Sequence, residues 1–562
     1  MTDLQRGHAG RNMGRLLILI FALLGAAPSF AEEPQEIWFG PRSPTRHPTV
    51  DDWKELFQPD APWKIAAAHT QVFFMPIPCI MSAPDADVIA TVADLSRRHI
   101  AIGLPLMSIA RDRGTKMGGV EGYDYTENVT RVAQRLKQLG ITPKYLRIDS
   151  PLWFGHYDKQ ALACQYPVDE LVKRVAQNVG EYTKVFPDII VGDVEPVPPL
   201  LLASDWRETY RSFKEKLEAT IGKKIAFLHL DEAWRNPDVL TDMKIVADFA
   251  HSLGMKTGFI YDDGAEIPAT TNEEWIADVE KNVIRTESQA GLIPDQAVFQ
   301  SWENLPTCVM PETSPSAHTY LIDQYLIPRS RIMANRAPGK VTGQLIDAHD
   351  HGVASASITW ETPDFDPTRP LPVSTVSGTV PVKAASAILA VRLNRECNSS
   401  GRNDVLIGPL TYRETESGSV TQTIDYPAQA PSAKGSEVRL TVEQVGGQQA
   451  AHIVADPGQS MGFNSAPFAV TPNAHFEFHA PVDTVSGEGI FGFVAVIWMN
   501  ADHRGIGRVN LPVVRKYSVG GALTTDQNGH FSIPLPEDKA GKSVRLTFSG
   551  RAQLRPAIAL VP

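Results

Sequence analysis

The sequence predicts an α/β protein, a (β/α)8 TIM barrel followed by an all-β, jelly-roll-like sandwich domain. From about residue 63 to 361, short β-rich apolar runs alternate with amphipathic helical stretches, which is the pattern of parallel β-α units. Eight such repeats in roughly 300 residues favour a closed barrel over an open sheet. No run is followed by the glycine-rich loop of a nucleotide-binding fold, so that class is excluded.

Eight runs are predicted as barrel strands, with amphipathic helices between them. One helix begins near Asn128 and ends at Gly140, and another begins near Pro237 and ends at Gly254, each with its apolar residues on one face. The predicted strands are His69–Met75, Ile100–Ile109, Tyr145–Ser150, Ile189–Pro196, Ile225–Glu232, Thr257–Asp263, Val298–Glu303 and Ala354–Glu361.

The first 31 residues are typical of a secretory signal peptide. Three arginines precede the apolar run Leu16–Ala27, and Ser29-Phe30-Ala31 has the small-x-small form that a signal peptidase cuts. A bilayer span needs about 20 apolar residues, and this run has 12. We therefore expect an exported protein, periplasmic or extracellular, that is not membrane-bound after cleavage.

Charge and cysteine content exclude further classes. The formal net charge is −11; the signal peptide contributes three arginines and one aspartate, a net +2, so the mature chain carries −13. This sign opposes nucleic-acid partners and disfavours a strongly anionic polysaccharide. The cysteines lie far apart with no C-x-x-C pair, which argues against zinc-ribbon and thioredoxin folds, and any disulfide pairing stays open. The four cysteines are Cys79, Cys164, Cys308 and Cys397.

The barrel is predicted to span residues 32–361, and the residue pattern after it is different. Residues 362–400 begin with a proline-rich stretch and are predicted as a linker. Residues 401–562 contain short alternating strands and almost no helical periodicity, which predicts a β-sandwich. The stretch Gly462–Phe478 resembles the jelly-roll carbohydrate-binding modules attached to many glycosidases, which implies a sugar-binding domain.

Polar side chains are predicted to gather inside the barrel mouth. Outward side chains must be apolar to meet the helices, so Leu228 and Leu230 face out and His229 and Asp231 face in. By the same alternation Asp193 and Glu195 face in on the fourth predicted strand. Carboxylates on several strand ends favour glycoside chemistry run by paired acids. The other residues predicted to face inward are His69, Gln71, Arg147, Asp149, Tyr261, Asp263, Ser301, Glu303, Thr359 and Glu361.

Two motifs resemble the clan of retaining glycosidases with catalytic glutamates on strands four and seven. Gly192–Pro196 is similar to that clan's Asn-Glu-Pro motif, and Phe299–Glu303 supplies a second glutamate. The resemblance implies Glu195 as acid/base and Glu303 as nucleophile, although Val194 stands where the clan has asparagine. The residues expected to bind substrate are Asp149, Asp193, Asp231, Glu232, Tyr261, Asp262, Trp302 and Trp360.

Other interpretations of the function stay open. Asp193-Val-Glu195, Tyr261-Asp262 and Trp360 also resemble elements of chitinase-like barrels, which implies substrate-assisted cleavage with Glu195 as the acid. A non-catalytic polysaccharide-binding protein on a decayed barrel is a further alternative. A metal-dependent amidohydrolase needs His-x-His on its first strand, where this chain has His69-Thr-Gln71. We expect no metal, no cofactor and a polysaccharide or oligosaccharide partner; the oligomeric state is open.

Overall fold

The computed structural model describes residues 35–561, except for 46–49, 51, 113–120, 160–163, 237, 265–268, 303, 394–402, 417, 428–437, 456–460, 487–491, 514–516, 540–541 and 552–553. The predicted signal peptide, Glu303 and Cys397 thus lie outside the described residues. Within these ranges, no helix has the length and apolar character needed to cross a membrane. Cys79, Cys164 and Cys308 are free thiols.

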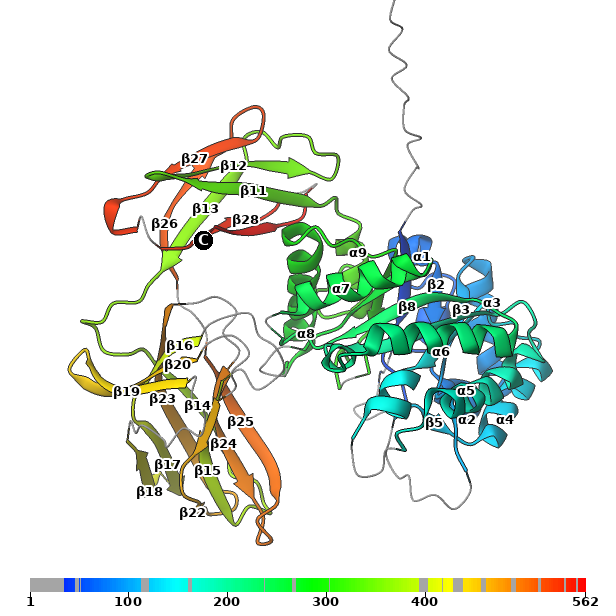
Figure 1. Cartoon of the computed structure of the whole chain (residues 1–562), viewed down its shortest axis with the longest axis horizontal. Coiled ribbons are helices and arrows are strands. Elements are labelled where there is room, and N and C mark those ends of the chain that lie inside the picture. The colour runs from blue at the N-terminus through cyan, green and yellow to red at the C-terminus, as the bar shows by residue number, and fades with distance from the viewer. Residues whose placement is uncertain are drawn as a thin grey trace, which may run out of the picture. The chain divides into compact units, whose positions relative to one another are not determined.

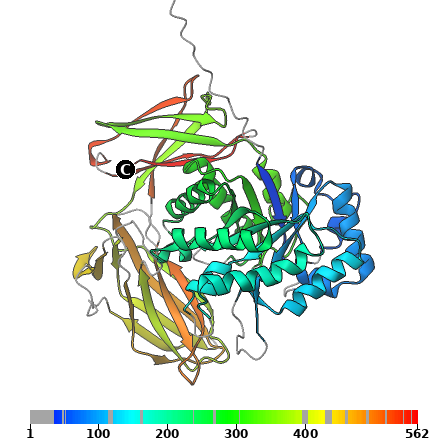
Figure 2. The ribbon, with the colours of Figure 1, turned by 45° about the vertical axis from the view of Figure 1, so that its right-hand side comes forward.

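Eight parallel strands close into the predicted barrel (Figures 1 and 2), in the neighbour order β1-β10-β9-β8-β7-β6-β3-β2. The fold class is therefore confirmed. The barrel strands are β1 (Glu36–Gly40), β2 (Val72–Phe74), β3 (Ala101–Leu106), β6 (Tyr145–Asp149), β7 (Ile190–Val197), β8 (Ile225–Glu232), β9 (Lys256–Tyr261) and β10 (Gln296–Gln300). The two-residue strands β4 (Ile109–Ala110) and β5 (Tyr123–Asp124) pair beside it.

The strand count was right, but one barrel strand was missed and one predicted strand lies outside the barrel. The first barrel strand is β1, which the sequence analysis missed, and His69 belongs to a helix that precedes the short strand β2. The predicted eighth strand, Ala354–Glu361, corresponds to β13 (Ser357–Pro363), which pairs antiparallel with β26 and β28 outside the barrel. Consequently β6 is the fourth barrel strand in chain order, β7 the fifth and β10 the eighth.

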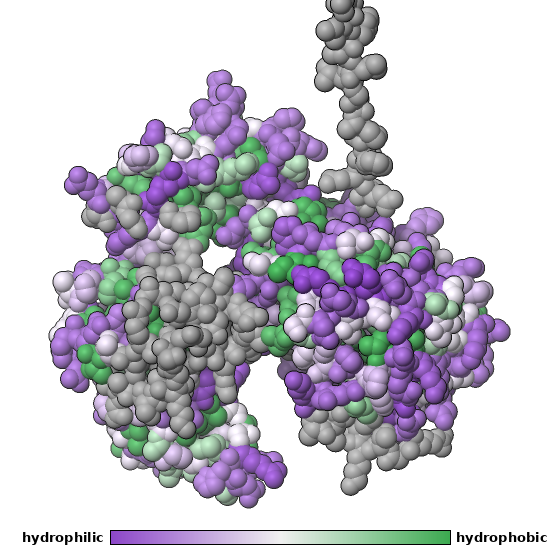
Figure 3. All heavy atoms as spheres, viewed as in Figure 1, coloured by the Kyte–Doolittle hydropathy of each residue, from purple (hydrophilic) through white to green (hydrophobic). Residues whose placement is uncertain are grey.

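Helices pack against the outer face of the barrel, as the apolar periodicity predicted. The two helices predicted from Asn128 and Pro237 are α4 and α7, and Gly140 and Gly254 beyond them have φ of 70° and 71°. That left-handed conformation favours glycine at a helix end. In Figure 3 the side chains over α5 and α6 are mostly hydrophilic, since their apolar faces meet the barrel. The helices are α1 (Lys64–His69), α2 (Ile77–Ser82), α3 (Asp85–Arg97), α4 (Thr126–Gln138), α5 (Val168–Thr183), α6 (Trp206–Ile221), α7 (Val239–Ser252), α8 (Asn272–Val283) and α9 (His318–Tyr325).

Antiparallel sheets follow the barrel, and their described residues form two main hydrophobic cores rather than the one predicted, with a smaller cluster of Leu371, Leu406, Val445 and Ala450. The first core lies between a sheet of order β11-β12-β27 and a sheet of order β26-β13-β28-β29. Their bounds are β11 (Ser330–Ala337), β12 (Lys340–Asp347), β13 (Ser357–Pro363), β26 (Tyr517–Thr524), β27 (His530–Pro534), β28 (Val544–Phe548) and β29 (Ala557–Val561).

The second core is made by the chain between β13 and β26. One sheet has the order β18-β17-β23-β16-β20-β19, with β14 also on β23, and the other β21-β15-β24-β25, with β22 also on β15. β14 and β15 fall within residues 362–400, so the predicted linker contains strands; the domain boundaries themselves stay predictions. Trp498 is buried in this core. The strands are β14 (Val373–Thr379), β15 (Ser386–Leu393), β16 (Asn403–Ile407), β17 (Leu410–Glu416), β18 (Ser419–Tyr426), β19 (Val438–Val445), β20 (Gln448–Ala455), β21 (Met461–Asn464), β22 (Phe468–Ala469), β23 (His475–Ser486), β24 (Gly492–Met499) and β25 (Gly505–Pro512).

Candidate active site

The alternation of side chains along the strands decides which polar groups enter the barrel. On β6, Leu146 and Ile148 pack in the outer core, so Arg147 and Asp149 point inward as predicted. On β8, Leu228 and Leu230 face out, and His229 and Asp231 face in. The apolar residues of the interior are Trp38, Val72, Phe74, Tyr145, Val194, Phe227, Ile260 and Val298.

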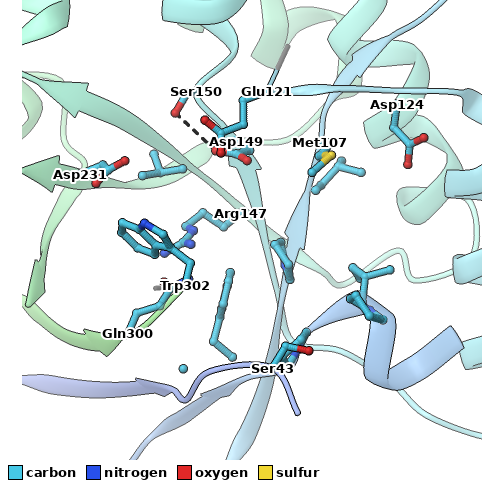
Figure 4. A pocket seen from close by; sticks show the side chains of 18 of the residues that line it. Ser43, Met107, Glu121, Asp124, Arg147, Asp149, Ser150, Asp231, Gln300 and Trp302 are labelled. Atoms are coloured by element: carbon cyan, nitrogen blue, oxygen red, sulfur yellow. Dashed lines mark hydrogen bonds between the residues drawn. The ribbon is translucent and has the colours of Figure 1, made fainter. Parts of the chain in front are cut away.

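Several of these inward residues, including Arg147, Asp149 and Asp231, line a cavity of about 490 Å³. Figure 4 shows Arg147 near the centre of the view, with Asp149 and Glu121 above it and Asp231 and Trp302 to its left. Because the carboxyl ends of barrel strands carry the chemistry in this fold, the cavity is the candidate active site. The polar and aromatic residues that line it are Ser43, Phe74, Glu121, Asp124, Arg147, Asp149, Ser150, Phe154, Tyr182, Asp231, Gln300, Ser301 and Trp302.

Asp149 ends β6 and faces the cavity. Among the described residues its carboxylate accepts one hydrogen bond, from the Ser150 hydroxyl at 3.4 Å. Burial raises the pKa of Asp149 to about 6, the Arg147 guanidinium opposes this, and the negative charge of Glu121 adds to it. A carboxyl with this pKa can carry charge at neutral pH and still exchange a proton near that pH.

Asp231, near the end of β8, also faces the cavity. Among the described residues, no donor hydrogen-bonds to its carboxyl and no cation pairs with it within 4.0 Å. Burial raises its pKa to about 7, and the charge of Asp149 raises it further, while Arg147 opposes the shift. Near neutral pH, Asp231 is therefore protonated to a larger extent than Asp149.

The acids on β7 point the other way, which corrects the prediction for Asp193 and Glu195. Val194 lines the cavity, and a Cβ at Gly192 would meet the Phe227 ring at 2.2 Å, so the even-numbered residues face the interior. Asp193 and Glu195 consequently face the helices. Asp193 is fully buried, and Tyr210 on α6 donates to its Oδ2 at 2.9 Å.

Glu195 is buried beneath the segment that follows β6. Its two carboxylate oxygens accept from the backbone N–H groups of Leu152 and Trp153, at 2.7 and 3.0 Å. Burial raises the pKa of Glu195 well above its ordinary value, and the neighbouring charge of Asp193 raises it further. Glu195 does not line the cavity, because both of its oxygens are used to hold the chain at residues 152–153.

Three further residues predicted to bind substrate lie outside the cavity lining. Tyr261 packs on Trp234 with ring centroids 5.8 Å apart and donates to Glu287 at 2.8 Å, so it faces the helices rather than the interior. Glu232 is buried, and its Oε2 accepts from the backbone N–H of Ile260. Asp262 is also buried and is not part of the lining.

Of the two tryptophans predicted to bind substrate, one lines the cavity and the other does not. Trp302 lines the cavity, where its ring is placed to stack on a sugar. Trp360 is on β13 in an antiparallel sheet, where its ring packs over Gly520, so it does not end a barrel strand. Trp234 is buried against Tyr261. The expected nucleophile Glu303 lies outside the described residues.

Two polar residues of the cavity lining, Glu121 and Gln300, were not predicted from the sequence. Gln300 is the last residue of β10, and the alternation from Val298 would have identified it as inward. Glu121 comes from the segment after β4, where the sequence carries no periodic pattern. Within the described parts of the chain, no cluster of three or more metal-ligating side chains is found.

No protein-family model matches the chain, and no curated protein matches it. Similar solved structures include a glucosidase from Croceicoccus marinus, at 11% identity and TM-score 0.33 over 75% of this chain and 92% of that chain. A xylanase from Paenibacillus barcinonensis matches at 12% identity and TM-score 0.31, over 51% of this chain and 95% of that chain. A GH5_18 protein from Streptomyces cattleya matches at 11% identity and TM-score 0.29, over 48% of this chain and 71% of that chain. Similarities this distant carry no argument about the function, which has to be inferred from the cavity.

Proposed function

We propose that the protein is an exported glycoside hydrolase whose catalytic carboxyls are Asp149 and Asp231. One observation carries the proposal: two inward aspartates, on the fourth and sixth barrel strands, share one cavity and have pKa values raised to about 6 and about 7. Cleavage of a glycosidic bond needs one carboxylic acid and one carboxylate. This pair supplies both near neutral pH.

The environments of the two aspartates assign their roles. Asp231, with the higher pKa, protonates the oxygen of the leaving sugar. Asp149, which receives the Ser150 hydroxyl and lies in the field of Arg147, supplies the carboxylate. That carboxylate either attacks the anomeric carbon or activates a water molecule, and the leaving sugar departs with the proton from Asp231.

This assignment takes the place of the glutamate pair expected from the motif resemblance. Both oxygens of Glu195 accept backbone hydrogen bonds, so protonating a substrate would require breaking one of them. Trp302 supplies a stacking face for a sugar ring. Export remains a proposal that rests on the arginines and the apolar run of the first 31 residues.

Release of reducing sugar from a panel of neutral polysaccharides tests the proposal. The mature protein, dialysed against a chelator, is expected to release reducing ends from at least one polymer, and Asp149→Asn and Asp231→Asn are expected to release almost none. Asp193→Asn is the matched control, because it changes a buried carboxyl of the same barrel that faces α6 instead of the cavity. Binding of a polymer without hydrolysis would indicate a sugar-binding protein, and full activity in both cavity variants would refute the assignment.

A further inference from the structure

A chain of polar groups runs through the barrel interior from the cavity floor; its first three members, Arg147, His229 and Gln296, are buried. Arg147 Nη1 lies 3.2 Å from His229 Nδ1, and His229 Nε2 lies 2.9 Å from Gln296 Oε1. Gln296 Nε2 donates to Glu36 Oε2 at 2.8 Å, and Glu36 Oε1 pairs with Lys256 at 3.1 Å. Five strands, β1, β6, β8, β9 and β10, contribute one residue each.

The direction of these hydrogen bonds fixes the state of His229. A guanidinium can only donate, so Nδ1 of His229 must accept from Arg147. The imidazole is therefore the neutral Nε2–H form, which donates to Gln296 Oε1, and the Gln296 amide nitrogen is left to donate to Glu36. Burial lowers the pKa of His229 well below its ordinary value, and the charge of Arg147 lowers it further. A neutral imidazole between an arginine and an amide is thus the only form that satisfies every bond.

One nitrogen of the Arg147 guanidinium is hydrogen-bonded to His229, and the residue also faces the cavity. Arg147 is 6% exposed, and its guanidinium lies 4.1 Å from the centroid of the Phe74 ring. Within the described residues, its side chain donates one hydrogen bond, to His229, and Arg147 lines the cavity. No carboxylate of the described residues lies within 4.0 Å of its nitrogens. Unpaired N–H groups of a buried cation are costly, so the free edge of Arg147 is available to a substrate.

We propose that Arg147 binds substrate on the cavity floor and that His229 is the positioning residue that aims it. This inference rests on the proposed function, because it assigns the substrate contact of the same site. The forked guanidinium matches two adjacent oxygen atoms. Gln300, which also lines the cavity, has a buried Oε1 without a partner among the described residues, and this oxygen can accept from a sugar hydroxyl.

The charges around Arg147 select the kind of sugar. Asp149 on its own strand, Asp193 on β7 and Asp231 on β8 favour its charged form, and burial opposes them, so that its pKa is about 10. Glu121 adds a further carboxylate to the cavity wall. An acidic sugar would bring its carboxylate against these groups. The substrate class is therefore a neutral sugar with adjacent hydroxyl groups, bound through oxygens that accept from Arg147.

Steady-state kinetics of the mature protein test the contact. Arg147→Lys keeps the charge but loses the fork, and we expect KM to rise by about 10- to 100-fold with a smaller change in kcat. His229→Gln should raise KM by about three- to tenfold, and the double variant should be little worse than Arg147→Lys alone. His318→Gln is the matched control: this imidazole is also fully buried, packs between the Phe39 and Trp275 rings, and forms no hydrogen bond with the residues that the structure describes. Equal effects of the two histidine changes on KM would overturn the proposal.

Nitrogen-15 NMR of the histidine rings gives a readout that needs no substrate. The His229 ring, assigned from its absence in His229→Gln or by elimination, is expected to stay neutral and Nε2-protonated from pH 5 to 8. An Nδ1-protonated or charged ring would refute the positioning role. Such a result would leave the Asp149 and Asp231 activity test unaffected, and loss of that test would not change the NMR result, so the two failures are distinguishable.

Discussion

Two adjacent barrel strands carry carboxylates near their carboxyl ends, and they use them differently. On β6, Asp149 faces the cavity and has one long hydrogen bond, 3.4 Å, from Ser150. On β7, Glu195 faces the helices and has two short backbone bonds, 2.7 and 3.0 Å. Burial raises the pKa of both groups. A raised pKa therefore does not identify a catalytic carboxyl in this barrel; oxygens that are open to a cavity do.

The largest expected difference between the two strands is in activity. Asp149→Asn removes the carboxylate that the reaction requires, so kcat/KM should fall by about 10²-fold or more. The melting temperature should not fall below that of the parent, since Asn can still accept from Ser150 and removes a carboxylate whose charged form burial disfavours. Calorimetry and initial rates on one preparation measure both quantities, and a variant that keeps its activity would show that Asp149 is not part of the reaction.

Stability should show the opposite ranking. Glu195→Ala leaves the N–H groups of Leu152 and Trp153 buried without acceptors, at a cost of about 1–3 kcal/mol each. Urea denaturation should therefore show a free energy of unfolding several kcal/mol lower, while activity per folded molecule stays within about tenfold. If activity disappeared at unchanged stability, Glu195 would belong to the catalytic machinery after all.

A smaller loss is expected at the other outward acid. Tyr210→Phe removes the hydroxyl that donates to Asp193 Oδ2, and Asp193 Oδ1 already lacks a partner among the described residues. We expect a destabilisation of about 1–3 kcal/mol, with an unchanged pH dependence of activity. A shift of that pH dependence would indicate that Asp193 communicates with the cavity.

The last expected effect is a gain in stability. The pKa of Asp231 is about 7 in the folded protein and about 3.9 in an unfolded chain, so the folded state binds this proton more tightly. The contribution of Asp231 to stability therefore falls as the pH rises from 4 through 7. Asp231→Asn cannot ionise, so it should be more stable than the parent at pH 8 and equal to it at pH 4. Thermal unfolding at the two pH values measures this, and no gain at pH 8 would mean that Asp231 is not buried as described.

The barrel could be predicted because its eight repeats are regular, but its strands could not be numbered correctly. β1 has five residues and no helical repeat before it, so nothing periodic marks it. β13 has the apolar content of a barrel strand, and a sequence does not distinguish parallel from antiparallel pairing of such a segment. One strand missed and one added left the total at eight and shifted the rank of every strand between them.

The cavity residues were predictable only on strands with one clearly apolar face. β6 and β8 have leucines and isoleucine on their outer sides, so Asp149 and Asp231 were placed correctly. β7 has apolar residues on both sides, and the decisive position is Gly192, which faces inward because Phe227 fills the space beside it. That contact joins two strands 35 residues apart in sequence, and no pattern within β7 contains it.

The most direct test of the central claim compares Asp231→Asn with Glu195→Gln on one substrate that the parent hydrolyses. Both changes replace a buried carboxyl by an amide, and only one of these carboxyls lines the cavity. We predict that kcat/KM falls by about 10²-fold or more in Asp231→Asn and by no more than about tenfold in Glu195→Gln, after correction for the folded fraction. The reverse order would contradict the assignment of the cavity aspartates.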